Sequence, residues 1–279
     1  MKTQKLKVAF QGEHGAYSEI AAGKFFPGAL LIPVKQFYEI FDLLARLEVD
    51  AAAVPVENSI EGSINEIYDL LLDSKMKVTG EIFQKINHCL IANTEKDKLT
   101  KVYSHPQAIA QCRNYLRVKG LEPVPTYDTA GAVRMIKEKH FTDAGAVGSR
   151  RAAKIYEMRI IDEGIQDREN NYTRFLILSN FETAPSGEDR TSLIFGLKHS
   201  PGALFNVLKE FANCNINLTK IESRPTKEKP WEYNFYVDIE GHATENNIKS
   251  VISKIKDKCT FFKMMGSYKK GIVNQSSDF

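Results

Sequence analysis

Short apolar segments alternate with helix-like segments through the first part of the chain, and this alternation constrains the fold more than any other feature. LKVAF (6–10) precedes a helix-like stretch at 16–26, and LLIPV (30–34) precedes FYEIFDLLARL (37–47), whose apolar residues recur at spacings of three and four. Parallel strands need a crossover, usually a helix, between them. The order therefore predicts parallel sheets flanked by helices.

The alternation is interrupted once. Two strand-like runs, KVTGEIF (77–83) and KINHCLIA (85–92), follow each other with little helical signal between them. Afterwards the alternation resumes, with a helix at 107–117, and it closes with a strand at 173–179 that is expected to return to the first lobe. An α/β unit that stops and restarts predicts two lobes with a cleft between them, as in periplasmic binding proteins.

A region with a different order of elements follows NFETAPSGEDR (180–190), whose Pro, Ser, Gly and charged residues are typical of a linker. Its expected elements are strands at 191–198, 216–224, 232–240 and 259–268, a turn at 225–230, and helices opening at Pro201 and spanning 243–257. The order βαββαβ is the ferredoxin-like arrangement. The sequence thus predicts a two-lobed α/β region at 1–180, a linker at 181–189 and an α+β domain at 190–279.

Charge and composition exclude several classes of protein. The 38 basic and 35 acidic residues leave a net charge of +3, which gives no argument for nucleic acid or an anionic membrane as a partner. No apolar run approaches the roughly 20 residues that cross a bilayer, and no signal peptide is recognisable, so a cytoplasmic location is expected. The four cysteines are scattered without the spacing of a metal site, and free thiols are expected.

The junction after the strand AAAVPV (51–56) carries three consecutive polar residues, Glu57, Asn58 and Ser59. Open α/β sheets place ligand groups at such strand ends. Capping of the next helix explains one polar residue there, but not three in a row. The junction is therefore a candidate ligand site.

YSHPQAIAQC (103–112) repeats this pattern in the second lobe, with Ser104 at the end of a strand and Gln111 one turn into the helix. A lone histidine such as His105 is more often a hydrogen-bonded structural residue than a base. Two more strand-to-helix turns, around Ala16 and Ser149, present backbone N–H groups that suit an anion, although a plain tight turn explains them equally well.

In the stretch NNYTRF, polar residues run into a strand. Side chains alternate between the faces of a strand, so Asn171, Thr173 and Phe175 share one face, whereas Tyr172 and Arg174 take the other. The first face offers an amide, a hydroxyl on a stiff β-branched side chain and an aromatic wall. These are features of a binding site, with a solvated start of the strand as the alternative.

Taken together, PVENSIEGSI, YSHPQAIAQC, NNYTRF, SPGALFNVL and NLTKIESRP resemble prephenate dehydratases with a C-terminal ACT regulatory domain, and the resemblance covers nearly the whole chain in order. TRF and ESRP are specific in combination. The turn that reads AAIAS in many relatives is GAVGS (145–149) here. The resemblance implies conversion of prephenate to phenylpyruvate, carbon dioxide and water in phenylalanine biosynthesis, without a cofactor or metal.

The resemblance also implies roles for residues. The expected catalytic set is Thr173, Glu57, Asn58, Ser59, Ser104, Gln111 and Phe175, and the expected substrate-binding set is Ala16, Tyr17, Ser149, Asn171 and Arg174. Thr173 is expected to hydrogen-bond the leaving hydroxyl. A threonine hydroxyl is too weak an acid to give up its proton alone, so the hypothesis adds Glu57 or a water as the proton donor. Strand alternation turns Arg174 away from Thr173, which favours a structural ion pair for it.

The ACT segment implies a site for free L-phenylalanine. The expected residues are Gly202, Ala203, Leu204, Asn217, Leu218, Glu222, Ser223 and Arg224. Such ligands usually sit between subunits, so a homodimer or homotetramer is expected. Two alternatives stay open: an enzyme of the same family that acts on arogenate, with selectivity near TAGAV (129–133), and a non-catalytic ligand sensor that carries an ACT module.

Overall fold

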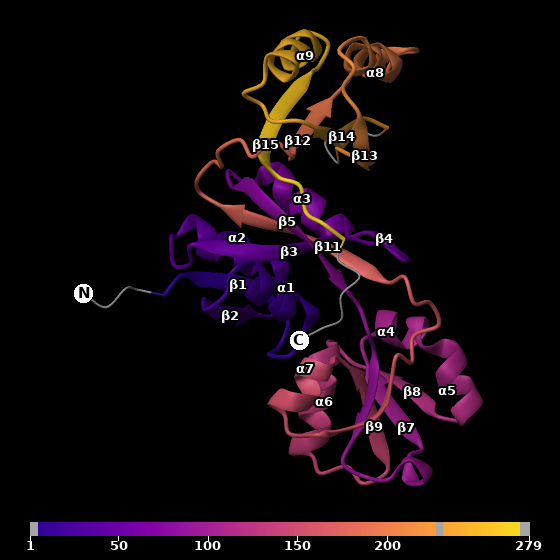
Figure 1. The fold of residues 1–279 in the computed structure, drawn as a ribbon. Coiled ribbons are helices and arrows are strands. Elements are labelled where there is room, and N and C mark those ends of the chain that lie inside the picture. Colours follow the sequence, from indigo (N-terminus) through magenta and orange to yellow (C-terminus); the bar gives the residue numbers. More distant parts are fainter. Residues whose placement is uncertain (1–4, 227–230, 274–279) are drawn as a thin grey trace. The chain divides into compact units, whose positions relative to one another are not determined.

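The computed structural model describes residues 5–226 and 231–273, so most of the predicted turn at 225–230 lies outside the described residues. Figure 1 follows the elements along the chain by colour. The contacts of the chain divide it into two compact units. Unit 1 comprises Met1–Ile64, Ile82–Phe175 and Val273–Phe279, and unit 2 comprises Asn65–Glu81 and Leu176–Ile272.

The first sheet has the strand order β2-β1-β3-β11-β5, with β4 paired to β3. Its strands are β1 (Lys7–Gln11), β2 (Leu30–Val34), β3 (Ala51–Asn58), β4 (Gly62–Ser63), β5 (Lys77–Lys85) and β11 (Tyr172–Ser179), and its helices are α1 (Tyr17–Phe25), α2 (Phe37–Ala45) and α3 (Asn65–Asp73). β1 pairs in parallel with both β2 and β3, as the alternation predicts. The closing strand β11 does return to this sheet.

The second sheet has the order β10-β6-β9-β7-β8 and belongs to unit 1. Its strands are β6 (Cys89–Ala92), β7 (Lys101–Ser104), β8 (Glu122–Pro125), β9 (Ala144–Gly148) and β10 (Arg159–Glu163), and its helices are α4 (Pro106–Gln111), α5 (Arg113–Lys119), α6 (Thr129–Glu138) and α7 (Arg150–Ile155), with a short 3-10 turn at Lys96–Lys98. The two α/β lobes are thus confirmed.

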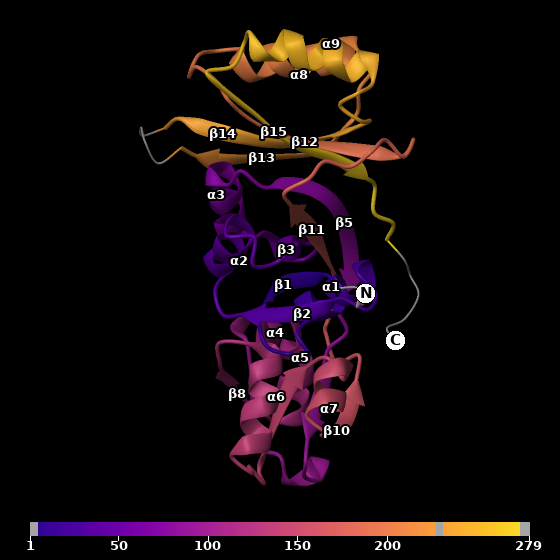
Figure 2. The same cartoon turned by 90° about the vertical axis from the view of Figure 1, so that its left-hand side faces the viewer.

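The third sheet is antiparallel, in the order β13-β14-β12-β15. It consists of β12 (Asp189–Gly196), β13 (Leu218–Pro225), β14 (Tyr233–Glu240) and β15 (Phe261–Lys269). The helices α8 (Ala203–Asn213) and α9 (Asn246–Lys256) lie side by side over one face of it (Figure 2). The order βαββαβ is confirmed, and apolar side chains such as Phe195, Phe211 and Ile255 fill the layer between helices and sheet.

One predicted helix is in fact two. The stretch 107–117 breaks at Cys112 into α4 and α5. The Asp167 carboxylate accepts a hydrogen bond from the backbone N–H of Asn114 at 3.1 Å and so caps the first turn of α5 from a distant part of the chain. The periodicity of residues 107–117 cannot reveal a helix cap that is supplied by a residue far away in the sequence. The strand β10, which pairs antiparallel with β6, was likewise not expected.

Gly15 brings the turn after β1 against α7 of the second lobe. Its φ is +95°, and an added Cβ would lie 2.6 Å from Ala152 Cα. The Ser149 hydroxyl donates a hydrogen bond to the Gly15 carbonyl oxygen at 2.6 Å. A hydrogen bond therefore connects the two lobes of unit 1 at Gly15, where the close contact leaves no room for a side chain.

Gly15→Ala is expected to lower the free energy of unfolding by about 2–4 kcal/mol, because positive φ and overpacking add. Gly28→Ala is the matched control: its φ is +83°, but nothing lies within 4 Å of the added Cβ, so only the backbone cost of about 1–2 kcal/mol applies. Urea unfolding measures both. Equal losses in the two variants would show that the contact with α7 is not tight.

Candidate active site

A pocket of about 400 Å³ lies in unit 1, and both lobes contribute to its wall. Six of the residues expected from the sequence line it: Ala16, Tyr17, Asn58, Gln111, Thr173 and Phe175. Thr173 and Phe175 share this wall while Tyr172 and Arg174 are not among the lining residues, as strand alternation predicts. Asn171, which was expected on the same face, is fully buried and is not among the lining residues. Half of the twelve residues expected to be catalytic or substrate-binding thus line one pocket.

The orientation of the Asn58 amide is determined by the turn that follows it. Its Oδ1 accepts hydrogen bonds from the backbone N–H groups of Ile60 at 3.0 Å and Glu61 at 3.1 Å. Only the NH₂ group is left to face the site. It donates to Asn171 Oδ1 at 2.8 Å and to Thr173 Oγ1 at 3.0 Å, and the Tyr172 carbonyl oxygen lies within reach at 3.2 Å.

The network continues from Asn171 into the second lobe. Asn171, which is fully buried, donates through Nδ2 to Gln111 Oε1 at 2.8 Å. His88 Nε2 lies 3.0 Å from the same oxygen, and because an amide oxygen only accepts, Nε2 carries the ring proton. Every amide in the line from His88 to Asn58 is thereby oriented.

This orientation decides what Thr173 is able to do. Its Oγ1 accepts the hydrogen bond from Asn58, so its own hydroxyl hydrogen points elsewhere. No acceptor for that hydrogen is found among the described residues, although the side chain is buried and lines the pocket. A buried hydroxyl without an acceptor is costly, and a ligand oxygen in the pocket would satisfy it.

His88 is a buried, neutral member of this network. Burial lowers the pKa of His88 to about 4, although its hydrogen bond to Gln111 works in the opposite direction. An unfolded histidine titrates near 6.5. Between these two pH values His88 is protonated in the unfolded chain but not in the folded chain. The free energy of unfolding is therefore not reduced by His88 above pH 6.5, and it falls as the pH drops toward 4.

We expect the His88 contribution to the free energy of unfolding to fall by about 2 kcal/mol between pH 7 and pH 5. His88→Gln keeps a donor near the position of Nε2 but does not titrate, so its unfolding free energy is expected to depend less on pH by that amount. Urea denaturation of both proteins at the two pH values measures the difference. Parallel pH dependences would contradict a neutral buried His88.

Two more titratable residues line the pocket, His105 and Asp128. Burial lowers the pKa of His105, against the charge of Asp128, and burial raises the pKa of Asp128. His105 Nδ1 accepts the backbone N–H of Gln107 at 3.2 Å, so its Nε2 carries the proton of the neutral ring. Asp128 Oδ1 accepts the Gly131 N–H at 2.6 Å and caps α6.

Apart from the Asp128 carboxyl, the electrostatics of the described pocket wall come from helix ends. The helices α1, α4 and α6 all begin at the wall, through Ala16, His105 and Asp128 respectively. Among the described lining residues there is no Lys or Arg. The positive ends of the helices and neutral donors are thus what this wall offers to an anion.

Two serines expected to contact substrate are engaged elsewhere. The Ser104 hydroxyl is buried and donates to the Val147 carbonyl oxygen at 2.7 Å, which ties β7 to β9. Ser149 caps α7 and donates to Gly15. Neither serine is among the residues that line the pocket.

Glu57, Ser59 and Arg174 also lie outside the pocket wall. Ser59 Oγ accepts the Tyr172 N–H at 2.9 Å, and its backbone N–H donates to the Tyr172 carbonyl oxygen at 2.8 Å, so it holds the start of β11. Arg174 is buried. The proposed roles of Glu57 and Arg174 in the reaction stay predictions.

Comparison with known proteins gives the family. The model of the prephenate dehydratase family matches residues 8–183, and that of the ACT domain matches residues 191–257. An arogenate dehydratase 2 of Petunia hybrida is 42% identical over 95% of this chain and 72% of its own length. A bifunctional chorismate mutase/prephenate dehydratase of Aquifex aeolicus is 39% identical over 98% of this chain and 76% of its own length.

Comparison with solved structures also finds a prephenate dehydratase. A prephenate dehydratase from Arthrobacter aurescens in complex with L-Phe has a TM-score of 0.88 at 27% identity, covering 95% of this chain and 90% of that one. A protein described as a quorum quenching acylase, GqqA, has a TM-score of 0.87 at 30% identity, covering 94% and 97%.

The chain belongs to the prephenate dehydratase family. Its C-terminal domain is an ACT domain. Among residues 5–226 and 231–273, none of the helices combines the length and the apolar character of a membrane span. The same part of the chain holds no cluster of three or more His, Cys, Asp or Glu side chains arranged for a metal ion.

In the ACT domain, Gly202, Ala203 and Leu204 form the start of α8, and the Gly202 backbone has a φ of +79°. Leu218 begins β13, and the preceding Asn217 donates from its amide to Glu240 Oε2 at 3.2 Å. Their roles in a phenylalanine site stay predictions.

The predicted ligand residues of β13 split between its two faces. Ser223 is level with Phe235, which packs in the helix-side core. Glu222 and Arg224 alternate to the opposite face, where the Arg224 guanidinium contacts the Asp69 carboxylate of α3 at 3.3 Å. Arg224 therefore forms an ion pair within unit 2, and its expected role in the phenylalanine site stays a prediction.

Sequence reasoning missed His88 and Asp128. His88 stands in the apolar run KINHCLIA, where a lone histidine between Asn87 and Cys89 is a weak signal of a buried polar contact. Asp128 ends TYD before a helix and reads as a simple N-cap, which it also is. Only the folded chain shows that both face the pocket that contains Thr173.

Proposed function

We propose that this protein is a prephenate dehydratase that converts prephenate to phenylpyruvate, with feedback control by phenylalanine at its ACT domain. The ring carboxylate leaves as carbon dioxide, and the electron pair of its bond moves into the ring. The ring hydroxyl leaves as hydroxide and takes up a proton to become water. Aromatisation supplies the driving force, so the protein must mainly orient the substrate and assist the hydroxide.

The observation that carries this proposal is the free hydroxyl hydrogen of Thr173. Because Asn58 occupies the oxygen as a donor, Thr173 is set to donate to an oxygen of the ligand. A hydrogen bond to the departing hydroxyl strengthens as negative charge develops on it, and this is how a fixed donor lowers a barrier.

The substrate carries two carboxylates, and the pocket meets them with helix ends. The first turn of α1, which begins at the pocket wall, and the neutral His105 are the donors we propose for them.

The test is turnover by the purified protein. Prephenate and arogenate are supplied in parallel, with and without phenylalanine, and phenylpyruvate and phenylalanine are quantified. Turnover of prephenate that responds to phenylalanine supports the proposal. Arogenate is the second candidate substrate, favoured by the name of the petunia relative, and turnover of arogenate alone would move the substrate while keeping the chemistry.

Acyl transfer, suggested by the name of the acylase neighbour, is less well supported. It needs a nucleophile with a base in hydrogen-bond reach. In the described pocket, the Thr173 hydroxyl is bonded to an amide rather than to His88 or His105. No turnover of either dehydratase substrate, with tight binding of one, would instead support a ligand sensor.

Assembly and location complete the proposal. A homodimer or homotetramer is proposed because phenylalanine sites of ACT domains usually lie between subunits, and light scattering coupled to gel filtration tests it. A cytoplasmic location is proposed because the buried Cys112 keeps its thiol outside any disulfide, as suits a reducing compartment, and cell fractionation tests it.

A further inference from the structure

The chain crosses between unit 1 and unit 2 next to the pocket. It passes from one unit to the other after Ile64, after Glu81 and after Phe175. Ile64 and Phe175 line the pocket themselves, and the second crossing lies within β5, which leads directly to the lining residues Ile86 and His88. A change that unit 2 transmits along any of these three segments therefore arrives at the wall of the active site.

Unit 2 combines the ACT domain with two segments that fall within the prephenate dehydratase match, Asn65–Glu81 and the end of β11. The first half of β5 is packed closely against the ACT sheet. An added Cβ on Gly266 of β15 would lie 2.2 Å from the Val78 carbonyl oxygen. One end of β5 thus packs against the ACT sheet, and the other end leads into the wall of the active site.

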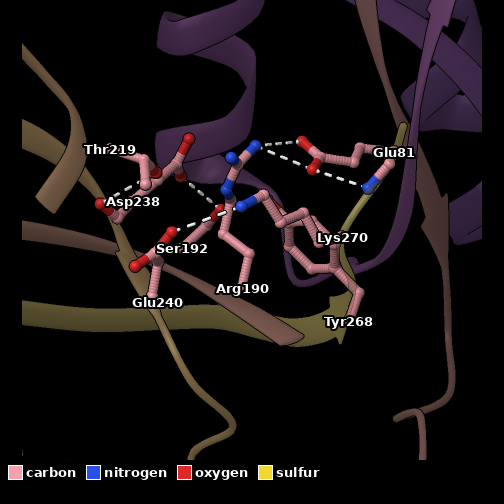
Figure 3. A network of polar contacts seen from close by, with 9 residues as sticks. Glu81, Arg190, Ser192, Thr219, Asp238, Glu240, Tyr268 and Lys270 are labelled. Carbon is pink, nitrogen blue, oxygen red and sulfur yellow. Dashed lines mark hydrogen bonds and ion pairs between the residues drawn. The ribbon is translucent and has the colours of Figure 1, made fainter. Parts of the chain in front are cut away.

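A buried ion pair holds this end of β5. Arg190 of β12 contacts both carboxylate oxygens of Glu81 through Nη1, at 2.7 and 2.6 Å, and Gly271 N–H donates to Glu81 Oε1 at 2.9 Å (Figure 3). The side chains are 9% exposed for Arg190 and 0% for Glu81. Solvent does not screen this contact as it screens a surface pair.

The same face of β12 continues the polar network into the sheet. The Ser192 hydroxyl donates to Asp238 Oδ1 at 2.5 Å, and its oxygen lies 2.7 Å from the buried Tyr268 hydroxyl (Figure 3). By contrast, Lys270 and Glu240 form an exposed pair of 3.3 Å at the edge of the same network. Arg190 is thus anchored in the ACT sheet at one side and bound to β5 at the other.

We propose that the Glu81–Arg190 ion pair is the coupling element through which phenylalanine bound at the ACT domain acts on the active site. A shift of β12 carries Glu81 with it, and β5 passes the displacement to Ile86 and His88. Ile86 N–H donates to the Asn171 carbonyl oxygen at 2.8 Å, and Asn171 is two residues before Thr173. The inference rests on the proposed function, since it explains how its feedback reaches the chemistry.

Energetics favour this role over simple stabilisation. A buried ion pair adds little net stability compared with apolar residues of the same size, whereas removing one partner leaves an uncompensated buried charge. The two side chains therefore move together rather than separate. A contact of this kind transmits a displacement, and its loss is expected to uncouple the two sites.

The experiment compares wild type with Glu81→Gln, which keeps the shape but removes the charge, and with Lys270→Gln as the matched control on the exposed pair. Prephenate turnover is measured against phenylalanine concentration, and phenylalanine binding is measured by calorimetry. Glu81→Gln is expected to keep the phenylalanine Kd and the uninhibited kcat within about threefold. The fold-change that phenylalanine causes in turnover is expected to drop at least tenfold. Lys270→Gln is expected to respond as wild type.

A second variant keeps the test decisive if the single change prevents folding. Glu81→Leu with Arg190→Met removes both charges together, which buried pairs tolerate. It too is expected to bind phenylalanine without responding to it. A wild-type response to phenylalanine in either of these variants would overturn the proposal.

Hydrogen exchange separates this proposal from the proposed function. In wild type, phenylalanine is expected to change amide exchange at 82–88 and at 172–175, and this readout needs no substrate. No change in either segment, although phenylalanine binds, would overturn the coupling. Absence of turnover of prephenate and of arogenate would instead overturn the proposed function.

Discussion

Thr173→Ala is expected to lower kcat for prephenate roughly 10²- to 10⁴-fold, while KM changes by less than about threefold. The reason is the direction of one hydrogen bond: Asn58 donates to Thr173, so the threonine hydrogen is available only to the leaving hydroxyl. A contact that strengthens in the transition state affects kcat rather than binding. Steady-state kinetics with phenylpyruvate detection measures both constants.

Thr173→Ser and Thr173→Val sharpen this prediction. Serine keeps the hydroxyl and is expected to retain most of kcat, whereas valine keeps the shape and is expected to behave as alanine does. Glu57→Gln is measured alongside as a test of the proton donor. If Glu57→Gln keeps full kcat, Glu57 is not the donor, and Asp128 or a water takes its place. A Thr173→Val enzyme with nearly full kcat would remove Thr173 from the mechanism.

Asn58→Asp is expected to lower kcat at least 10²-fold although it changes only an NH₂ group to an oxygen. The turn is retained, because the other oxygen still accepts the N–H groups of Ile60 and Glu61. The new carboxylate oxygen accepts the Thr173 hydrogen and so withdraws it from the substrate. It also places a negative charge in a pocket proposed to hold a dianion, so KM is expected to rise as well.

The matched control for this change is Asn114→Asp, the same substitution on exposed helix α5 outside the pocket. It is expected to leave both constants unchanged within about twofold. Activity of Asn58→Asp is expected to recover in part as the pH falls and the carboxyl becomes protonated, because a protonated carboxyl donates again. Unaltered kcat at neutral pH would contradict the orientation derived for Asn58.

Much of the fold was predictable because the signals are local. The apolar run of β3 is buried along nearly its whole length, and the order of elements after the linker matches the ACT sheet. The face of β11 that carries Thr173 and Phe175 also follows from the sequence, since alternation in a strand depends only on position. These features need no knowledge of distant residues.

The tertiary structure decided which polar residues meet. The break at Cys112 depends on Asp167, and the ACT-side contact of Arg224 depends on Asp69 of α3, each far away in the chain. His88 enters the site only because β5 leads it there.

The sequence by itself thus determined most of the elements, their order and the strand face that carries Thr173, because periodicity and residue type act over a few neighbouring positions. Only the tertiary structure decided the direction of the hydrogen bond to Thr173 and the burial of Glu81 with Arg190. Both depend on partners 115 and 109 positions away in the chain, and no local pattern records which distant group will satisfy a donor or a charge.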